Sequence, residues 1–156
     1  MRHLAIIMDG NGRWASARRK LPLFGHEAGA ESLERVMSYC RDAGIEFLTV
    51  YAFSTENWKR SKTEVSGLMK LLSTFISQKR EKLVSDGIRF KVIGRRNDLP
   101  SKLQKQIADL EEATSSGKFV LIVALSYGGR DEILRAAAKF QGGGEEQFAS
   151  CLDTAG

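Results

Sequence analysis

The chain has 156 residues, 42% of them apolar and 28% charged, which suffices for one globular domain with a buried core and excludes a disordered chain. Its formal net charge of +5 favours anionic partners, but the sequence has no basic stripe with interleaved aromatic residues, so we expect no nucleic-acid partner. The two cysteines lie far apart, no signal peptide is expected, and the longest apolar run, 119–125, is too short to span a bilayer. These features predict a cytoplasmic protein.

Apolar runs alternate with amphipathic stretches along the chain. In chain order, the patterns predict a strand at 3–8, a helix at 27–43, a strand at 46–53, a helix at 61–85, a strand at 89–93, a helix at 99–115, a strand at 119–126 and a helix at 131–140. The long helix has a suitable N-cap in Ser61, because Glu64 stands three residues later. Four strand–helix units in succession predict an α/β fold with a parallel sheet covered by helices on both faces.

Polar residues gather after each predicted strand. In such sheets, ligands bind outside the carboxyl ends of the strands. The polar clusters are 9–13, 54–60, 94–97 and 126–130, and three of the four combine glycine or hydroxyl groups with arginine. We therefore expect a binding site at this edge of the sheet.

The first cluster, in "LAIIMDGNGRWA", has the spacing G-x-G-x-x-A of a dinucleotide-binding loop. That fold needs an acidic residue about 20 residues further on, at the end of the second strand, for the ribose. Here the second strand ends near Phe53, roughly twice as far away, and residues 18–25, which contain Pro22, are expected to delay the next helix. Both features count against a dinucleotide.

The loop still suits a phosphate. Gly10 and Gly12 let successive N–H groups converge on an anion, and Arg13 can add a charge-assisted hydrogen bond. Asp9 would repel that anion unless a divalent cation joins the two, as Mg²⁺ does between carboxylates and substrate phosphates. The alternative is a turn-forming Asp-Gly pair that binds no ligand.

The second cluster, in "YAFSTENWKR", places many hydrogen-bonding groups at the end of a strand. Taken alone, it is also consistent with a helix cap in which Ser54 or Asn57 closes a short turn. His26, in "FGH", is likewise more typical of a structural histidine when it is considered alone.

Four blocks, "HLAIIMDGNGRWA", "FGHEAGA", "YAFSTENWKRSKTEV" and "LSYGGRDEI", closely resemble the cis-prenyltransferases, in particular bacterial undecaprenyl diphosphate synthases. The resemblance implies an enzyme that condenses isopentenyl diphosphate onto farnesyl diphosphate with new Z double bonds and depends on Mg²⁺. Its product would be a polyprenyl diphosphate, the precursor of a lipid carrier for the cell wall. The resemblance also implies a homodimer and peripheral membrane contact through the lipid product.

Carried onto this sequence, the resemblance implies that Asp9 is the catalytic aspartate and Mg²⁺ ligand, and that Asn57 is the residue described as proton acceptor. The other matched positions are expected to contact substrate: Gly10, Asn11, Gly12, Arg13, Trp14, His26, Ser54, Thr55, Glu56, Trp58 and Arg60. Glu64 matches an acidic residue near the head groups. An amide is a very weak base, so we expect Asn57 to orient the group that takes the proton. The helix at 61–85, with Val50 and Ala52 beside it, is expected to line a tunnel for the growing chain.

Two departures from the family pattern stand out. Pro22 occupies the position of a family arginine, whose diphosphate contact is missing here or supplied by Arg19 or Lys20. The family's C-terminal strands, with an arginine–serine motif and a metal-binding glutamate, have no counterpart before Gly156. We therefore expect residues 1–156 to be a single domain that is incomplete at its C-terminus and nearly inactive alone. The alternative is a noncatalytic subunit that binds an active partner, which the intact motif residues disfavour.

Overall fold

The computed structural model describes residues 1–155. Its strands are β1 (His3–Ile7), β2 (Phe47–Ser54), β3 (Ile88–Ile93) and β4 (Phe119–Tyr127). Its α-helices are α1 (Asn11–Ser16), α2 (Pro22–Asp42), α3 (Lys62–Ser85), α4 (Ser101–Ala113), α5 (Gly129–Lys139) and α6 (Glu145–Ala149), and two short 3₁₀ helices are η1 (Thr55–Lys59) and η2 (Arg96–Asp98).

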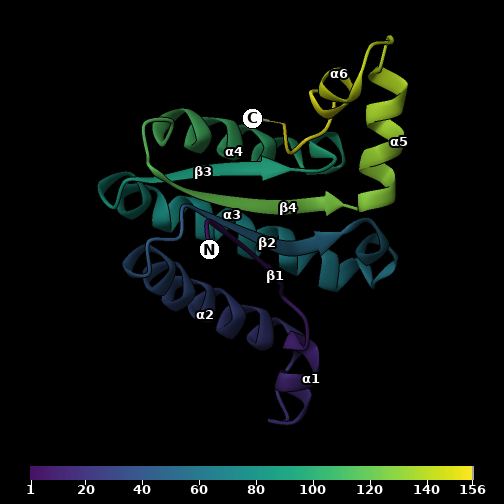
Figure 1. Ribbon diagram of the computed structural model, residues 1–156. Coiled ribbons are helices and arrows are strands. Elements are labelled where there is room, and N and C mark those ends of the chain that lie inside the picture. Colours follow the sequence, from purple (N-terminus) through teal and green to yellow (C-terminus); the bar gives the residue numbers. More distant parts are fainter. Residues whose placement is uncertain (156) are drawn as a thin grey trace.

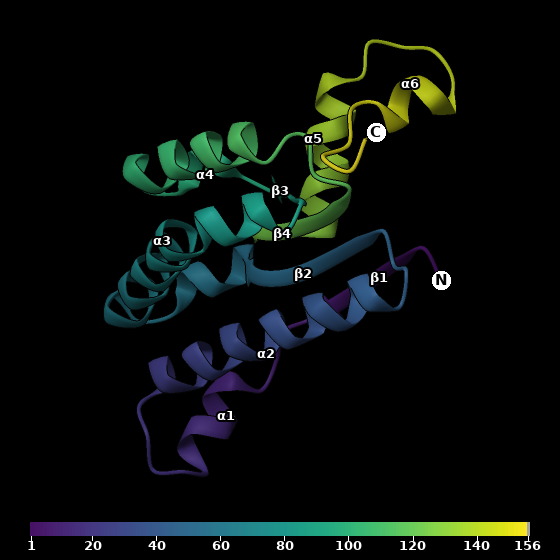
Figure 2. The ribbon, with the colours of Figure 1, turned by 90° about the vertical axis from the view of Figure 1, so that its left-hand side faces the viewer.

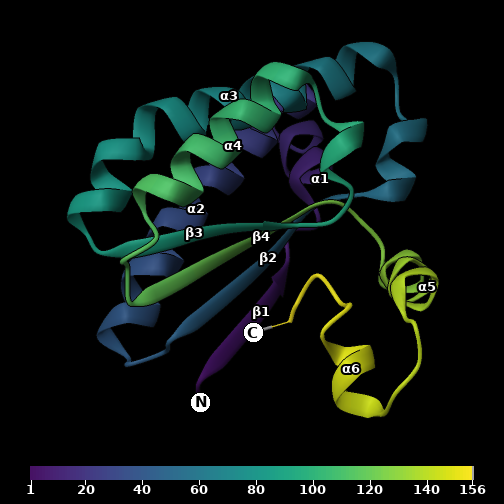
Figure 3. The same ribbon diagram turned by 90° about the horizontal axis from the view of Figure 1, so that it is seen from above.

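The four strands form one parallel sheet in the order β1-β2-β4-β3. Figure 3 shows α2, α3 and α4 on one face and α5 and α6 on the other, near the carboxyl ends of the strands (Figure 1). The prediction of a parallel sheet with helices on both faces is therefore confirmed. The second face is covered unevenly: Ile7 on the edge strand β1 is 74% exposed, whereas Ile93 and Ala124 are buried.

The long helix α3 begins where its sequence predicts. The Ser61 hydroxyl accepts a hydrogen bond from the Glu64 backbone N–H at 3.2 Å, so one free donor of the first turn is satisfied. Leu68, Met69 and Ile76 from its apolar stripe are buried in the core beneath the sheet. The helix ends at Ser85, and its next turn contains Gly87 with φ of +64°.

Two expectations about the segment after β1 are wrong. A helix does follow the glycine loop at once, because Gly10 adopts φ of +83° and α1 begins at the next residue. The following helix α2 begins at Pro22 rather than at residue 27, since proline is favoured in the first turn, where its missing N–H is not needed. Only the sequence distance from the glycine loop to the end of the second strand still counts against a dinucleotide.

No helix within residues 1–155 is both long and apolar enough to cross a membrane.

Candidate active site at the carboxyl ends of β1 and β2

The loop after β1 holds Asp9 beside Arg13. The Asp9 carboxylate accepts hydrogen bonds from the Gly10 backbone N–H at 2.5 Å and from Arg13 Nη2 at 3.0 Å. Both side chains of this ion pair are more than three-quarters exposed, so the pair adds little to stability and opens easily. Because first-turn N–H groups lack partners within a helix, those of α1 remain available to an anion.

The short helix α1 lies directly on α2, because two glycines of α2 leave room for it. A Cβ at Gly25 would stand 1.9 Å from the carbonyl oxygen of Asn11, and one at Gly29 would stand 2.9 Å from the Asn11 amide oxygen. Asn11 Nδ2 also lies 3.4 Å from His26 Nδ1 on the same helix. This close packing fixes the loop of Asp9 and Gly10 relative to α2.

The turn η1 after β2 is closed by Asn57. Its amide oxygen accepts a hydrogen bond from the Ser54 backbone N–H at 2.9 Å. The capping interpretation of this cluster is therefore correct, and it leaves the Asn57 NH₂ group free to donate toward a ligand. Hydrogen bonds from the Glu56 backbone and from the Ser54 hydroxyl lower the pKa of the Glu56 carboxyl, which is exposed and ionised.

Trp58 anchors η1 to the neighbouring strand. Its Nε1–H donates to the Ser126 hydroxyl at 2.9 Å, and that hydroxyl donates to Asp98 Oδ2 at 2.8 Å. The indole also packs edge-on against Phe53, with ring centroids 5.0 Å apart. Ser126 is fully buried and has φ of +47°, an uncommon conformation for a residue with a side chain.

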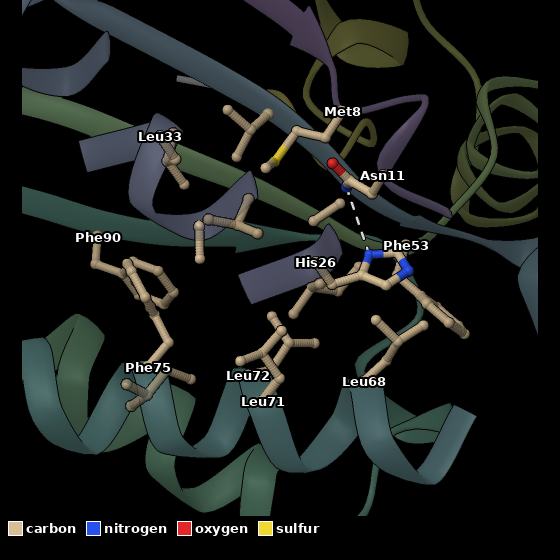
Figure 4. Close-up of a pocket in the computed structure, with 16 residues that line it drawn as sticks. Met8, Asn11, His26, Leu33, Phe53, Leu68, Leu71, Leu72, Phe75 and Phe90 are labelled. Atoms are coloured by element: carbon tan, nitrogen blue, oxygen red, sulfur yellow. Dashed lines mark hydrogen bonds between the residues drawn. The ribbon is translucent and has the colours of Figure 1, made fainter. Parts of the chain in front are cut away.

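Two adjoining cavities open at this edge of the sheet. The first, called here the polar cavity, is lined by Ile7, Met8, Asp9, His26, Tyr51, Ala52, Phe53, Ser54, Asn57, Arg60, Leu68, Ala124 and Tyr127. The second, called the apolar cavity, lies between α2, α3 and the sheet and has only two polar residues in its wall, Asn11 and His26 (Figure 4). Both share a common wall of five residues: Met8, His26, Ala52, Phe53 and Leu68.

Figure 4 shows how the apolar cavity is arranged from end to end. Asn11 and His26 lie toward one end, beside the polar cavity, and Phe75 and Phe90 lie at the other. The prediction that α3 lines a cavity with Val50 and Ala52 is supported by these wall residues. A ligand that fills both spaces would meet polar and charged side chains at one end and apolar side chains along the rest.

His26 stands at the junction of the two cavities. Burial and the neighbouring Arg60 guanidinium lower the pKa of its imidazole, and Glu64 opposes this shift only in part. The ring is therefore neutral at pH 7. Its Nε2 is buried without a hydrogen-bond partner among the described residues, so it can accept from or donate to a ligand.

The structure brings together five of the predicted site residues in the polar cavity: Asp9, His26, Ser54, Asn57 and Arg60. Gly10, Asn11 and Trp14 line an adjacent groove between α1, α2 and β1. Gly12 and Arg13 complete the first turn of α1. Three further predicted residues line none of these three spaces, because they form part of η1 itself: Thr55, Glu56 and Trp58. Arg60 pairs with Glu64 at 2.7 Å.

The arginines after β3 do not join this site. Arg95 donates to Asp131 at 2.9 Å, and Arg96 donates to Glu111 at 2.6 Å. Asp131 also accepts from Arg135, so the cluster after β3 is tied to α5 by ion pairs. The cluster after β3 therefore contributes neither arginine to the lining of the polar cavity, because both are paired with carboxylates that lie further along the chain.

Sequence reasoning missed two tyrosines in the polar cavity. Tyr51 and Tyr127 lie side by side in its wall, with ring centroids 5.5 Å apart. Burial and the adjacent Glu132 carboxylate raise the pKa of the Tyr127 hydroxyl, so this group stays protonated. Tyr51 follows the period-2 alternation of β2, which could have placed it on the face opposite to Val50.

The acidic residues fit one mode of magnesium binding. Among residues 1–155, no group of three or more histidine, cysteine, aspartate or glutamate side chains could hold a metal alone. Mg²⁺ is commonly bound by one or two carboxylates with substrate phosphates and waters completing its shell. The exposed Asp9 carboxylate, beside free backbone N–H groups, suits that arrangement.

Comparisons with known proteins agree with this architecture. A profile of the family described as "Putative undecaprenyl diphosphate synthase" matches residues 7–155. The chain is 46% identical over 160 residues to an isoprenyl transferase of Wolinella succinogenes, and the match covers 99% of this chain and 70% of the relative. It is 48% identical to an isoprenyl transferase of Fusobacterium nucleatum, of which it spans 64% while 94% of this chain is covered.

Two solved structures share the fold. Lavandulyl diphosphate synthase from Lavandula x intermedia, solved with dimethylallyl diphosphate, aligns with a TM-score of 0.92 at 33% identity over 98% of this chain and 71% of that protein. A "probable undecaprenyl diphosphate synthase" from Campylobacter jejuni aligns with a TM-score of 0.80 at 32% identity over 97% of this chain and 69% of its own. The chain therefore belongs to the undecaprenyl diphosphate synthase family.

Proposed function

We propose that this chain binds an allylic isoprenoid diphosphate, farnesyl diphosphate, and serves its elongation by isopentenyl diphosphate with formation of Z double bonds. The observation that carries this proposal is the shared wall of the two cavities. Asp9, Asn57 and Arg60 line a polar space that continues past His26 into an apolar one, and this pair of spaces matches a diphosphate head joined to a hydrocarbon chain.

The loop at the start of α1 would stabilise the leaving group. When the bond between allylic C1 and the diphosphate oxygen breaks, its electron pair leaves with the diphosphate and positive charge develops on carbon. The first-turn N–H groups and the Arg13 guanidinium are placed to bind the charge that develops on the diphosphate. Arg13 becomes available for this when its exposed contact with Asp9 opens.

Asp9 would hold the metal. The Asp9 carboxylate would hold Mg²⁺ beside the substrate phosphates, and the ion would supply the positive charge needed for a carboxylate and a diphosphate to share one site. This role would explain why an aspartate directly precedes an anion-binding loop.

Asn57 would position the group that receives the proton. The double bond of isopentenyl diphosphate attacks allylic C1, and C2 of isopentenyl diphosphate then loses a proton to form the new double bond. Since the Asn57 amide oxygen already accepts from the Ser54 N–H, its NH₂ group is the part left to donate to a ligand. A donor of this kind can hold a phosphate oxygen or a water that takes the proton, and it is not itself a base.

The apolar cavity would accept the hydrocarbon chain. Ala52 lies in the wall shared by the two cavities, where a small side chain leaves space. In a form of the enzyme that turns over, Ala52→Leu should therefore shorten the product, which chromatography of the radiolabelled polyprenyl diphosphates would measure. Products of unchanged length would show that the chain runs elsewhere.

Calorimetric binding of farnesyl diphosphate to the purified chain tests the proposal without requiring turnover. We expect binding in Mg²⁺ that weakens at least about tenfold in chelator or in Asp9→Ala, because one charged contact to the head group is lost. Asp109→Ala, an exposed aspartate on α4, is the matched control and should bind as the native chain does. Equal affinity in chelator and in Asp9→Ala would overturn the proposal.

A further inference from the structure

The segment between β1 and the body of α2 forms a protruding corner. Figures 1 and 2 show α1 and the loop that follows it at one end of the molecule, away from the sheet. Residues 13–24, called here the basic corner, are all exposed except Ala15. So long a run of exposed residues is unusual for a segment that contains the end of one helix and the start of another.

The basic corner exposes four large apolar side chains. Leu21 is 71% exposed, and the other three are exposed by more than a third: Trp14, Leu23 and Phe24. Single exposed apolar residues are normal on protein surfaces, but a cluster within eleven positions marks an interaction site. The corner also adjoins α3, because Leu23 Cδ1 lies 3.6 Å from where a Cβ of Gly67 would stand.

The same segment concentrates positive charge. It contains four cations, namely Arg13, Arg18, Arg19 and Lys20, and no carboxylate. The Arg18 guanidinium lies 4.2 Å from the centroid of the Trp14 ring, and the Lys20 ammonium lies 5.6 Å from that of Phe24. The cations therefore stand beside the exposed aromatic rings rather than on a separate face.

We propose that the basic corner is a docking surface for an anionic phospholipid bilayer. Tryptophan and phenylalanine rings with adjacent arginine and lysine are the side chains that favour the boundary between lipid headgroups and acyl chains. The uniform sign of charge matches a layer of phosphate headgroups, which attracts cations across its whole area. A protein partner would be expected to meet carboxylates as well as cations, and within residues 13–24 there are none; the Asp9 carboxylate beside Arg13 belongs to the preceding loop.

This docking places one wall of the apolar cavity near the bilayer. Leu23 contacts α3 beside Leu68, and Leu68 lines both cavities. A hydrocarbon chain held between α2 and α3 would then lie close to the lipid phase in which such a chain dissolves. Arg13 is shared with the proposed diphosphate site, but the other cations and the exposed apolar side chains of the basic corner do not depend on the proposed reaction.

Vesicle binding by the purified chain, without isoprenoid, tests the proposal. The native chain should cosediment with vesicles of equal parts phosphatidylglycerol and phosphatidylcholine, and much less with phosphatidylcholine alone. In a Trp58→Phe background, the emission of Trp14 should shift to shorter wavelength on the mixed vesicles, because its ring leaves water. Added salt should weaken the binding.

Two sets of variants locate the surface. Leu21→Ser with Phe24→Ser should weaken partition at least about tenfold through lost apolar burial. Arg18→Gln, Arg19→Gln and Lys20→Gln together should weaken it about a hundredfold, at about fivefold per cation. Ile133→Ser with Leu134→Ser is the matched control: both side chains are exposed on α5 but stand beside Asp131 and Glu132, and they should leave partition unchanged.

The proposal is overturned if the native chain ignores the mixed vesicles, or if it binds neutral vesicles equally well. It is also overturned if the control variant loses as much partition as the corner variants, or if the corner variants bind like the native chain. Thermal unfolding followed by circular dichroism checks each variant. If Leu21→Ser with Phe24→Ser unfolds the chain, the triple glutamine variant alone tests the surface, since its three substituted side chains are exposed and should not be needed for folding.

Discussion

Gly25 is the position at which the fold and the proposed site depend most directly on one another. A Cβ there would stand 1.9 Å from the Asn11 carbonyl oxygen and 2.7 Å from its carbonyl carbon. Backbone atoms cannot rotate out of the way, so α1 must move by roughly 1 Å or more to restore a normal separation. Gly25→Ala should therefore displace the loop that carries Asp9 and Gly10.

The expected loss of stability follows from two opposing terms. Overpacking costs about 1–3 kcal/mol, and replacing a helical glycine by alanine returns about 0.5–1 kcal/mol. The difference is a net destabilisation of up to about 2.5 kcal/mol, which lowers Tm by up to about 10 °C in a chain of this size. The matched control is Gly67→Ala in α3, where a Cβ would make an ordinary contact 3.6 Å from Leu23, and it should raise Tm slightly.

Thermal unfolding and farnesyl diphosphate binding measure the two consequences separately. In Gly25→Ala we expect the lower Tm together with an affinity at least about tenfold weaker, because the anion-binding loop is displaced. Gly67→Ala should keep native affinity. A Gly25→Ala variant that melts at or above the native temperature and binds normally would refute the close packing of α1 on α2.

Three further changes test the site. Asn57→Asp keeps an acceptor for the Ser54 N–H and should melt close to the native protein, whereas Asn57→Ala should lose about 1 kcal/mol of stability. Both variants lack the amide donor, so in a form of the enzyme that turns over both should slow condensation by about a hundredfold or more. Native turnover in Asn57→Ala would contradict the assigned role. Ser126→Ala leaves the Trp58 indole N–H without its acceptor and should cost about 1–3 kcal/mol and change the fluorescence of Trp58; unchanged emission would contradict the anchoring contact. Because burial lowers the folded-state pKa of His26, its neutral form adds stability above the unfolded-state pKa of about 6.5, and this stability is lost as the pH falls through the folded-state value. Denaturant unfolding between neutral and mildly acid pH should show a fall in unfolding free energy that is smaller in His26→Gln, and an equal fall in both would contradict the shift.

The long elements could be predicted because local and tertiary signals agree. In α3, the Ser61 cap, the apolar stripe and the glycine beyond its end all indicate the same boundaries. The helix begins at Lys62, one residue after the predicted start, and ends at Ser85 as predicted. The short helix α1 was missed because six residues cannot form a stable helix by propensity alone. Its sequence signal was Gly25 and Gly29, four positions apart on one face of α2, which is the spacing of a close helix contact.

The candidate site could be predicted in part, for a related reason. Residues that directly follow β1 and β2 reach the same cavity because adjacent parallel strands end together. Whether each arginine is paired with a carboxylate could not be predicted, since the partner can lie far along the chain. Arg96 is neutralised by Glu111, whereas Arg13 meets only the exposed Asp9, and nothing local to either arginine distinguishes them.

The exposure of the Asp9–Arg13 pair has a consequence for ligand binding. A buried ion pair costs several kcal/mol to separate, because each charge is left without its partner in a medium that solvates it poorly. This pair is largely hydrated, at side-chain exposures of 76% and 80%, so separating it costs at most about 1 kcal/mol. A diphosphate that attracts Arg13 and a divalent cation that attracts Asp9 can therefore exchange for the contact at little expense. On the proposed function, the weakness of the pair in the free chain would allow the Arg13 guanidinium to bind the diphosphate and the Asp9 carboxylate to bind the cation.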